Sequence, residues 1–329
     1  MKAIWYEQLG TAPEVLRYGD IDRPQPQEGE VLVRLHASSV NPSDVKMRAG
    51  TRGGGTDMAF PRIIPHSDGA GVIEAAGKGV DSKRIGERVW ISNGQWQRAF
   101  GTAAQYIAID QHLAAPLPDQ VPFEIGASLG IPALTANHCL FSDGDIKGLT
   151  VLVSGGAGTV GNLAVQFARQ AGATVIATAG DDAGIESAKI AGAHHVFDYR
   201  DETLAKKILA ANQDQPVDRI IEVEFGANIE IDAKIIAPRG TIVSYGSTIV
   251  MKPELPFYSL MFKGVNIQLV LVYLLSKKER QAAVARVNKA LIEGKIDVPI
   301  HSSFPLEECA KAHATVENGR SGSVVLTIE

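Results

Sequence analysis

Residues 151–161, VLVSGGAGTVG, join a short apolar run to a glycine-rich turn. The overlapping segment TVGNLAVQFARQAG, residues 159–172, has the pattern of a helix that ends at glycine. Glycine permits a tight bend and a close approach of phosphate to the backbone, and the helix N-terminus adds free N–H groups. The turn carries a G-x-x-G variant from Gly158 to Gly161, not the three-glycine fingerprint. Because a strand is predicted before it and a helix after it, dinucleotide binding is favoured over an ordinary glycine-rich turn.

Strand and helix patterns alternate downstream of this turn. Short apolar strand patterns occur at residues 174–180, 195–199, 219–224 and 240–246, and a helical pattern occupies residues 183–193. Strands that alternate with helices indicate βαβ units and a parallel sheet. The sequence therefore predicts a Rossmann-like block in the interior of the chain.

The two ends of the chain have a different character. Strand patterns rich in aliphatic and β-branched residues recur at residues 30–40, 69–77, 87–92 and 101–110, and a closing strand is expected at residues 321–328. Helix signals are scarce in the N-terminal part. We therefore expect a strand-rich second domain that is built from both ends of the chain.

Composition excludes several classes of protein. The length of 329 residues suggests about two domains, and 45% hydrophobic with 21% charged residues is typical of a water-soluble globular protein. The net charge of −5 disfavours nucleic-acid binding. Two cysteines, Cys139 and Cys309, cannot form a four-cysteine zinc site or a disulfide framework, and they fit a reducing cytoplasm. The start lacks a signal-peptide core, and the apolar run at residues 265–275 is interrupted by Asn266 and Gln268, which predicts a buried strand rather than a membrane span.

The end of the second strand of the block bears on coenzyme choice. Residues 177–180, ATAG, offer no carboxylate for ribose hydroxyls, so a 2′-phosphate is tolerated there. Asp181 and Asp182 follow directly and favour NADH, unless they cap the next helix. Tyr199 and Arg200 either lie against the adenosine phosphate or form a surface loop pair. The balance predicts NADPH over NADH.

Six segments together carry a resemblance to a known family. They are GTAPEVLRYGDIDRPQPQEGEVLVRLHASSVNPSD (residues 10–44), IIPHSDGAGVIEAAG (63–77), GASLGIPALTANHCL (126–140), AGTVG (157–161), AGAHHVFDYR (191–200) and GRSGSVVL (319–326). The chain resembles the medium-chain dehydrogenase/reductases essentially end to end. Within them it is most similar to the zinc-free, zeta-crystallin-like NADPH:quinone oxidoreductases.

The resemblance implies an α/β protein of two domains. A GroES-like, strand-rich catalytic domain would comprise residues 1–121 and 266–329. A Rossmann domain with a doubly wound parallel sheet would comprise residues 122–265 and bind NADPH. The family also implies a homodimer or homotetramer joined through the Rossmann edge strand near residues 265–273, whose apolar, edge-like sequence suits pairing with a partner strand.

The coenzyme contacts expected from the turn, the strand ends and the resemblance form one set. It comprises Asn41, Thr135, Ala157, Gly158, Thr159, Val160, Thr178, Gly180, Tyr199, Phe225, Tyr245, Gly246 and Ser247. Thr135 is assigned to the nicotinamide by resemblance, and the alternative is a helix hydroxyl bonded to backbone. The last four residues follow predicted Rossmann strands, at the edge where ligands gather.

Metal ligands are missing where the zinc-containing relatives keep them. Asn41 stands where those relatives have a catalytic cysteine, and Ser67 and Asp68 stand where they have a His-Glu pair. His66 lies one position before the zinc-binding histidine, and a lone histidine there favours a packing or cleft residue over a ligand. The sequence therefore predicts no metal.

At several positions the chain departs from the quinone-reductase pattern, and these departures bear on which acceptor it reduces. Lys46 and Arg52 stand where those relatives commonly have tyrosines, and Gly184 lies near the place of a 2′-phosphate-binding lysine. Reduction of an enone or quinone puts negative charge on oxygen, which a donor must stabilise. Asn41, Lys46 and Arg52 are therefore the candidate catalytic residues, and the alternative for the two cations is a solvated surface.

We expect a cytoplasmic, zinc-independent enzyme that transfers hydride from NADPH to a small-molecule quinone or α,β-unsaturated carbonyl. The missing tyrosines keep a specialised enone or enoyl-thioester reductase open as an alternative. A non-catalytic NADPH-binding protein, crystallin-like or RNA-binding, remains open from another class, although the acidic net charge disfavours the RNA version.

Overall fold

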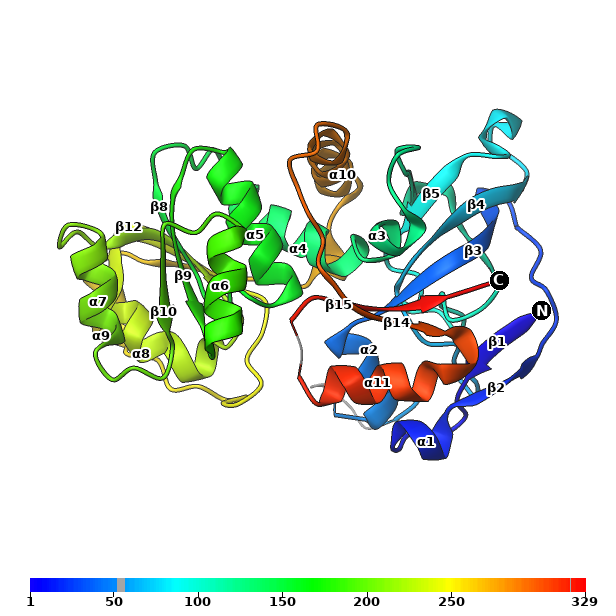
Figure 1. The fold of residues 1–329 in the computed structure, drawn as a ribbon, viewed down its shortest axis with the longest axis horizontal. Helices are drawn as coiled ribbons and strands as arrows, with labels where there is room; N and C mark the ends of the chain where they lie inside the picture. Colours follow the sequence, from blue (N-terminus) through cyan, green and yellow to red (C-terminus); the bar gives the residue numbers. More distant parts are fainter. Residues whose placement is uncertain (52–56, 320) are drawn as a thin grey trace. The chain divides into compact units, whose positions relative to one another are not determined.

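The computed structural model describes residues 1–51, 57–319 and 321–329 (Figure 1). The chain divides into two compact units. The first comprises Met1–Pro132, Leu291–Glu293 and Val298–Glu329, and the second comprises Ala133–Ala290 and Gly294–Asp297. This division differs from the predicted domains, because residues 266–290 lie in the second unit and residues 122–132 lie in the first.

The described part of the first unit is built on a 7-stranded sheet in the order β14-β15-β3-β4-β5-β7, with β6 paired to β3. Every pairing is antiparallel except that of β14 with β15. Its strands are β3 (Glu30–Val40), β4 (Asp68–Ala76), β5 (Arg88–Ile91), β6 (Tyr106–Asp110), β7 (Ala114–Pro116), β14 (Ile300–Pro305) and β15 (Ser323–Thr327). The two ends of the chain, which the sequence assigned to one domain, therefore share one sheet.

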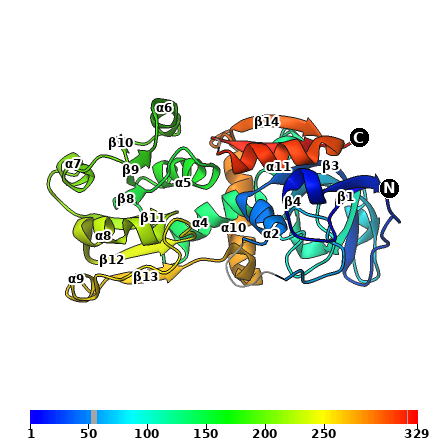
Figure 2. The same ribbon diagram turned by 90° about the horizontal axis from the view of Figure 1, so that it is seen from below.

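Smaller elements cover this sheet. A separate antiparallel pair joins β1 (Lys2–Trp5) to β2 (Arg17–Asp20). The helices are α1 (Ala12–Val15), α2 (Pro42–Ala49), α3 (Phe123–Ala127) and α11 (Cys309–Glu317). In Figure 2, α11 and β14 lie together, beside β3. Helix α3 is followed closely by α4 (Gly130–Phe141).

The long strand β3 organises the first core. Its residues are mostly buried because it pairs with β15, β4 and β6 at different points along its length. Close approach of β4 requires glycine at Gly71, where a Cβ would lie 1.9 Å from the carbonyl oxygen of Arg34. The core that results contains aliphatic residues of β3, β4, β5 and β6 together with residues of α11 and β15.

The second unit is built on a 6-stranded parallel sheet in the order β10-β9-β8-β11-β12-β13. Its strands are β8 (Thr150–Val153), β9 (Thr174–Ala179), β10 (His195–Asp198), β11 (Val217–Glu222), β12 (Ile236–Ser244) and β13 (Asn266–Leu269). Numbered within the unit, this is the order 3-2-1-4-5-6 of doubly wound dinucleotide-binding sheets. The predicted parallel sheet is confirmed.

A helix follows each of these strands along the chain. These helices are α5 (Thr159–Gln170), α6 (Asp182–Ile190), α7 (Leu204–Ala211), α8 (Phe225–Ile235), α9 (Phe257–Met261) and α10 (Lys277–Ile292). Helix α5 packs against α6, and α7 packs against α8. As the sequence predicted, α5 ends at a glycine, since Gly172 has a φ of +83°.

The apolar run at residues 265–275 forms β13, which is an edge strand. The expectation of a buried strand was wrong, because Ile267 is 38% and Leu269 is 76% exposed. Strand β13 pairs with β12 and has no partner on its other side within the described chain. Among the described residues, no helix is long and apolar enough to cross a membrane.

Candidate functional site

The glycine-rich turn after β8 leaves the N-terminus of α5 open. Gly161 has no space for a side chain, since a Cβ would lie 2.2 Å from the carbonyl oxygen of Gly155. Gly158 is the N-cap of α5, and no side chain caps the helix there. The buried hydroxyl of Thr159 has no partner in the described chain. The first N–H groups of the helix are therefore available to an anionic group such as a pyrophosphate.

The end of β9 supports this turn. Thr178 accepts from the backbone N–H of Gly156 through its carbonyl at 2.8 Å and from that of Gly155 through its hydroxyl at 3.1 Å. Next to it, Asp181 accepts from the backbone N–H of Gly184 at 2.7 Å. The carboxylate of Asp181 is thus used to cap α6, which was one of the two interpretations of the sequence.

Tyr199 and Arg200 lie at the end of β10. A Cβ on Gly180 would lie 2.6 Å from the phenol oxygen of Tyr199, so the tyrosine ring packs directly over that glycine. The guanidinium of Arg200 donates to both carboxylate oxygens of Asp198, with Nε 2.9 Å from Oδ1 and Nη2 2.8 Å from Oδ2, and the backbone N–H of Arg200 donates to Oδ1 at 2.9 Å. The pairing with Asp198 raises the pKa of Arg200.

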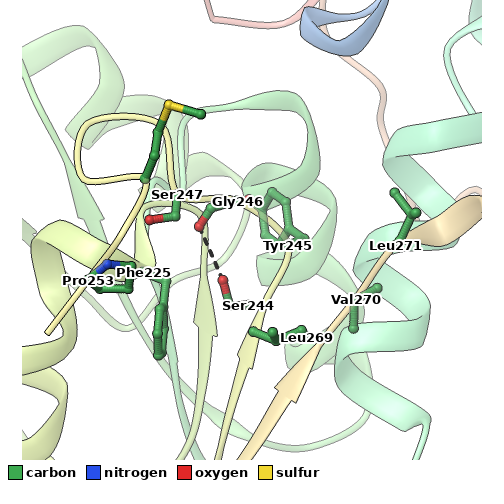
Figure 3. Close-up of a pocket in the computed structure, with 10 residues that line it drawn as sticks. Phe225, Ser244, Tyr245, Gly246, Ser247, Pro253, Leu269, Val270 and Leu271 are labelled. Atoms are coloured by element: carbon green, nitrogen blue, oxygen red, sulfur yellow. Dashed lines mark hydrogen bonds between the residues drawn. The ribbon is translucent and has the colours of Figure 1, made fainter. Parts of the chain in front are cut away.

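A cavity of about 340 Å³ lies where β11 and β12 end (Figure 3). Its lining is mostly apolar and comprises Phe225, Ser244, Tyr245, Gly246, Ser247, Met251, Pro253, Leu269, Val270 and Leu271. The backbone N–H of Phe225 donates to the carbonyl of Gly246 at 3.0 Å, and that of Gly226 donates to the hydroxyl of Ser247 at 2.9 Å. The structure therefore brings together four residues predicted from the sequence: Phe225, Tyr245, Gly246 and Ser247.

Two buried acids near these strand ends were not predicted. Glu222, at the end of β11, is 1% exposed, and Asp232, on α8, is 2% exposed. Burial raises the pKa of both carboxyl groups, and the charge of Glu222 raises that of Asp232 further. Glu222 accepts from the side chain of Asn228 at 3.0 Å, whereas one oxygen of Asp232 has no partner among the described residues. The sequence signal for Glu222 was an acidic residue within the apolar run RIIEVE, residues 219–224.

In the first unit, Asn41 is the N-cap of α2 and is held by a buried acid. Its side-chain nitrogen donates to Oδ2 of Asp68 at 2.9 Å, and its backbone N–H donates to Asp44 at 2.8 Å. Asp68 is fully buried, which raises its pKa well above the ordinary value. These hydrogen bonds fix Asn41 in one orientation, and the residue is 4% exposed.

The remaining predicted residues are placed as follows. Lys46 is half-buried on α2. Arg52 lies outside the described residues. Thr135 lies on α4, is 4% exposed and belongs to the second unit. The alanine and valine of the turn, Ala157 and Val160, are half-buried.

The positions that the resemblance aligns with zinc ligands of related dehydrogenases hold other donor groups in this chain. They hold an amide, a hydroxyl and a carboxyl group, from Asn41, Ser67 and Asp68, and the first and last of these bind one another. Zinc prefers thiolate and imidazole ligands. His66 is fully buried, and burial lowers the pKa of its imidazole to about 3.

Comparison with family models gives two matches. Residues 27–119 match the alcohol dehydrogenase GroES-like domain, and residues 159–289 match the zinc-binding dehydrogenase domain. The first match confirms the predicted GroES-like domain. The second lies over the parallel sheet of the second unit.

Curated relatives match over the whole chain. The quinone oxidoreductase of Rattus norvegicus is 33% identical over 334 residues, covering 100% of this chain and 98% of the relative. That of Homo sapiens is 32% identical with the same coverage.

Solved structures give the same result. A mycobacterial quinone oxidoreductase superimposes with a TM-score of 0.88 at 28% identity, covering 99% of each chain. The Escherichia coli quinone oxidoreductase complexed with NADPH superimposes with a TM-score of 0.86 at 25% identity, covering 99% of this chain and 100% of that one. The chain belongs to the quinone oxidoreductase family of the medium-chain dehydrogenase/reductase superfamily.

Proposed function

We propose that this chain is an NADPH-dependent oxidoreductase that reduces quinones or α,β-unsaturated carbonyl compounds. The observation that carries the proposal is the uncapped N-terminus of α5, which follows a glycine turn at the centre of a sheet with dinucleotide-binding strand order. Full-length similarity to quinone oxidoreductases, one of them solved with NADPH, supports it.

The coenzyme would be held along the carboxyl ends of the strands of the second unit. The pyrophosphate would lie against residues 157–160, with the adenosine near Thr178, Gly180 and Tyr199. The nicotinamide end would lie toward the cavity lined by residues 244–247 and Phe225. When bound, NADPH supplies a hydride, and these residues position its ring and exclude water around it.

Three polar side chains, Asn41, Lys46 and Arg52, would assist the acceptor. Hydride addition leaves negative charge on the acceptor oxygen, and a fixed donor nearby stabilises that charge. Asn41 is suited to contact the acceptor or the coenzyme ribose because Asp68 orients its amide. Lys46 and Arg52 would add positive charge. We propose that no metal takes part in this step, since Asn41, Ser67 and Asp68 do not offer zinc a suitable ligand set.

The cations at positions 46 and 52 also favour a second candidate. An enoyl thioester or another acceptor that carries negative charge would gain more from them than a neutral quinone would. A specialised enone or enoyl-thioester reductase therefore stays the alternative.

We further propose that the chain forms a homodimer or homotetramer through β13. Parallel strands expose unpaired backbone groups at a sheet edge, and a second copy of the same edge can satisfy them. Apolar side chains cluster in the sequence around this edge and are exposed: Phe257 at 62%, Tyr258 at 67%, Phe262 at 81% and Leu269 at 76%. The cytoplasm is the proposed location.

The test is NADPH consumption by the purified full chain against ortho- and para-quinones, simple enones and enoyl thioesters. We expect turnover with quinones or enones. Turnover with thioesters alone would move the chain to the second candidate. If the chain binds NADPH but turns over none of these acceptors, the proposed reaction is wrong.

A further inference from the structure

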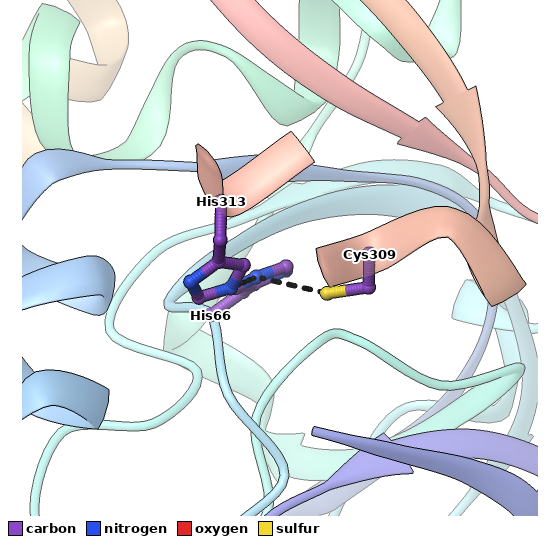
Figure 4. Close-up of side chains that lie close together, drawn as sticks. All are labelled: His66, Cys309 and His313. Carbon is purple, nitrogen blue, oxygen red and sulfur yellow. Dashed lines mark hydrogen bonds between the residues drawn. The ribbon is translucent and has the colours of Figure 1, made fainter. Parts of the chain in front are cut away.

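Three side chains with metal-binding donor atoms meet in the interior of the first unit (Figure 4). Cys309 and His313 lie one turn apart on α11, so they share one face of the helix. His66 approaches from the segment before β4. Nε2 of His66 lies 2.9 Å from Nε2 of His313 and 3.9 Å from Sγ of Cys309, and the three donor atoms all lie within 4.8 Å of one another. All three residues are 0% exposed.

The backbone holds His66 in an uncommon conformation that directs its ring to this point. Its φ is +76°, in the left-handed region that non-glycine residues seldom adopt. The carbonyl of His66 accepts from the backbone N–H of Thr102 at 3.0 Å. Gly101 allows this contact, because a Cβ there would lie 2.2 Å from the same carbonyl oxygen. The surrounding structure therefore fixes the placement of the imidazole.

A chain of hydrogen bonds determines which nitrogen of His66 carries the proton. Thr102 donates its hydroxyl hydrogen to the carbonyl of Asp68 at 2.7 Å. Ser38 lies 2.8 Å from the Thr102 hydroxyl, 3.4 Å from the same carbonyl and 2.9 Å from Nδ1 of His66. In the network where Thr102 donates to Asp68 and Ser38 donates to Thr102, Ser38 accepts from His66 Nδ1–H. The lone pair of His66 is then on Nε2, facing Cys309 and His313.

This arrangement matches the outer shell of a metal-binding histidine, whose second nitrogen donates to a fixed acceptor. Without metal, Nε2–H of His313 can donate to Nε2 of His66 at 2.9 Å, and a metal ion would take the place of that hydrogen bond. One lone pair on Nε2 of His66 faces both the thiol of Cys309 and the imidazole of His313. Nδ1 of His313 has no hydrogen-bond partner in the described chain. We propose that His66, Cys309 and His313 bind one monovalent thiophilic metal ion, Cu(I).

The number and charge of the donors select Cu(I) over Zn(II). The described residues supply three ligand side chains to this group, whereas structural zinc sites are almost always four-coordinate. Thiolate and imidazole ligands suit Cu(I). Cu(I) with one thiolate and two neutral imidazoles has no net charge, whereas Zn(II) would leave a positive charge in a fully buried site. Burial of an uncompensated charge is costly. Of the charged side chains that act on these ligands, Arg48 is paired with Glu317, and Asp44 belongs to the capping box of α2.

This site is separate from the positions that bear zinc in related dehydrogenases, which Asn41, Ser67 and Asp68 occupy here. The expectation of a metal-free chain would then hold only for those positions. Because its ligands are buried, the Cu(I) site would stabilise the first unit and take no part in hydride transfer.

The test is the metal content of the full chain itself. Metal-free protein is titrated anaerobically with Cu(I) in the presence of a chromophoric Cu(I) chelator. It is also refolded from urea with Cu(I), since the buried ligands slow entry to the folded chain. We expect one ion per chain, a higher Tm and an X-ray absorption spectrum with one sulfur and two nitrogen neighbours. No retained ion in either preparation, or a spectrum without sulfur, would overturn the proposal. Stronger retention of Zn(II) at the same residues would overturn the choice of ion.

Two variants with a matched control locate the site. Cys309→Ala is expected to abolish stoichiometric retention, whereas Cys139→Ala, which removes the other buried cysteine, is expected to retain the ion. Ser38→Ala keeps all three ligands and is expected to weaken Cu(I) affinity roughly 10–100-fold, the usual effect of losing an outer-shell partner. If Cys309→Ala fails to fold, Ser38→Ala and the wild-type titration still decide. Equal retention by Cys309→Ala and Cys139→Ala would contradict the assignment.

Discussion

Asn41 and Asp68 are joined by a hydrogen bond in the interior of the first unit. The side-chain nitrogen of Asn41 lies 2.9 Å from Oδ2 of Asp68, and the backbone N–H of Ile131 donates to the same oxygen at 2.7 Å. The other oxygen of Asp68 has no partner in the described residues. Burial raises the pKa of this carboxyl, which favours its neutral form. Asn41 is therefore oriented by a buried carboxyl group whose pKa is raised.

Substitution of Asp68 separates its shape from its charge. Asp68→Asn keeps an oxygen that can accept from Asn41 and Ile131, so we expect kcat within a few-fold of wild type. Asp68→Ala leaves both donors buried without an acceptor, and it is expected to lower the free energy of unfolding by about 1–3 kcal/mol and to reduce kcat. Urea unfolding and steady-state kinetics measure both effects. A large loss of kcat in Asp68→Asn would show that the ionised carboxylate is required.

The same substitution predicts a pH dependence of stability. Because the pKa of Asp68 is raised on folding, the folded chain binds this proton more tightly than the unfolded chain does. The stabilisation that comes from this raised pKa is complete below the pKa of Asp68 in the unfolded chain, and it is lost as the pH rises toward the pKa of Asp68 in the folded chain. Relative to wild type, Asp68→Asn should therefore gain stability as pH rises above about 4. Urea unfolding of both proteins across this range measures the difference, and a difference independent of pH would contradict the shift.

Gly158 tests the coenzyme turn without disturbing the fold. Its φ is −71°, and an added Cβ would meet its first neighbour, the carbonyl of Gly155, only at 3.4 Å. We expect Gly158→Ala to leave Tm nearly unchanged while its methyl group obstructs the pyrophosphate. We therefore expect NADPH to bind about tenfold more weakly, which corresponds to a loss of about 1.4 kcal/mol of binding free energy. Fluorescence titration with NADPH measures it.

Gly161→Ala is the contrasting variant. Its Cβ would lie 2.2 Å from the carbonyl of Gly155, so it should lower Tm as well as coenzyme affinity. If Gly158→Ala binds NADPH as wild type does, the coenzyme phosphates do not lie at this turn.

The sequence predicted the second unit better than the first. The turn at residues 155–161 could be predicted because local chemistry dictates it: glycine is needed where Gly161 meets Gly155. Contacts between distant segments could not. The hydrogen bond from Asn41 to Asp68 and the approach of His66 to α11 depend on how β3, β4 and the C-terminal segment fold together.

The exposure of β13 shows a second limit of sequence patterns. An apolar run predicts a strand, but the run alone does not distinguish the centre of a sheet from its edge. The family resemblance placed this run at the edge of the sheet, and the strand order, with β13 beyond β12, agrees with the exposure of Ile267 and Leu269.

Lys46 tests the proposed stabilisation of charge on the acceptor. If its ammonium group faces the developing oxyanion, Lys46→Gln should lower kcat by roughly 100-fold, as the loss of one oxyanion donor does elsewhere. Lys83→Gln, an exposed lysine of the same unit, is the control and should leave kcat unchanged. Steady-state kinetics with a saturating acceptor measures both. Equal kcat in the two variants would remove Lys46 from the catalytic residues.

The edge-strand assembly is tested by placing a charge among the exposed apolar residues beside β13. Phe262 is 81% exposed, and Phe262→Lys should shift the chain toward monomer by burying a cation in the interface. Ile190, which is 78% exposed on α6, provides a matched control, and Ile190→Lys should leave the assembly unchanged. Light scattering measures the mass of each protein. A wild-type monomer, or an unchanged assembly in Phe262→Lys, would contradict this interface.

Hydride transfer itself is the central claim, and isotope transfer tests it most directly. The full chain is supplied with NADPH that carries deuterium at the reactive position of the nicotinamide, together with an enone that it turns over. We expect slower turnover than with unlabelled NADPH and one deuterium on the reduced carbon of the product, found by mass spectrometry. Product without deuterium, or no coenzyme consumption with any quinone or enone, would contradict the proposed function.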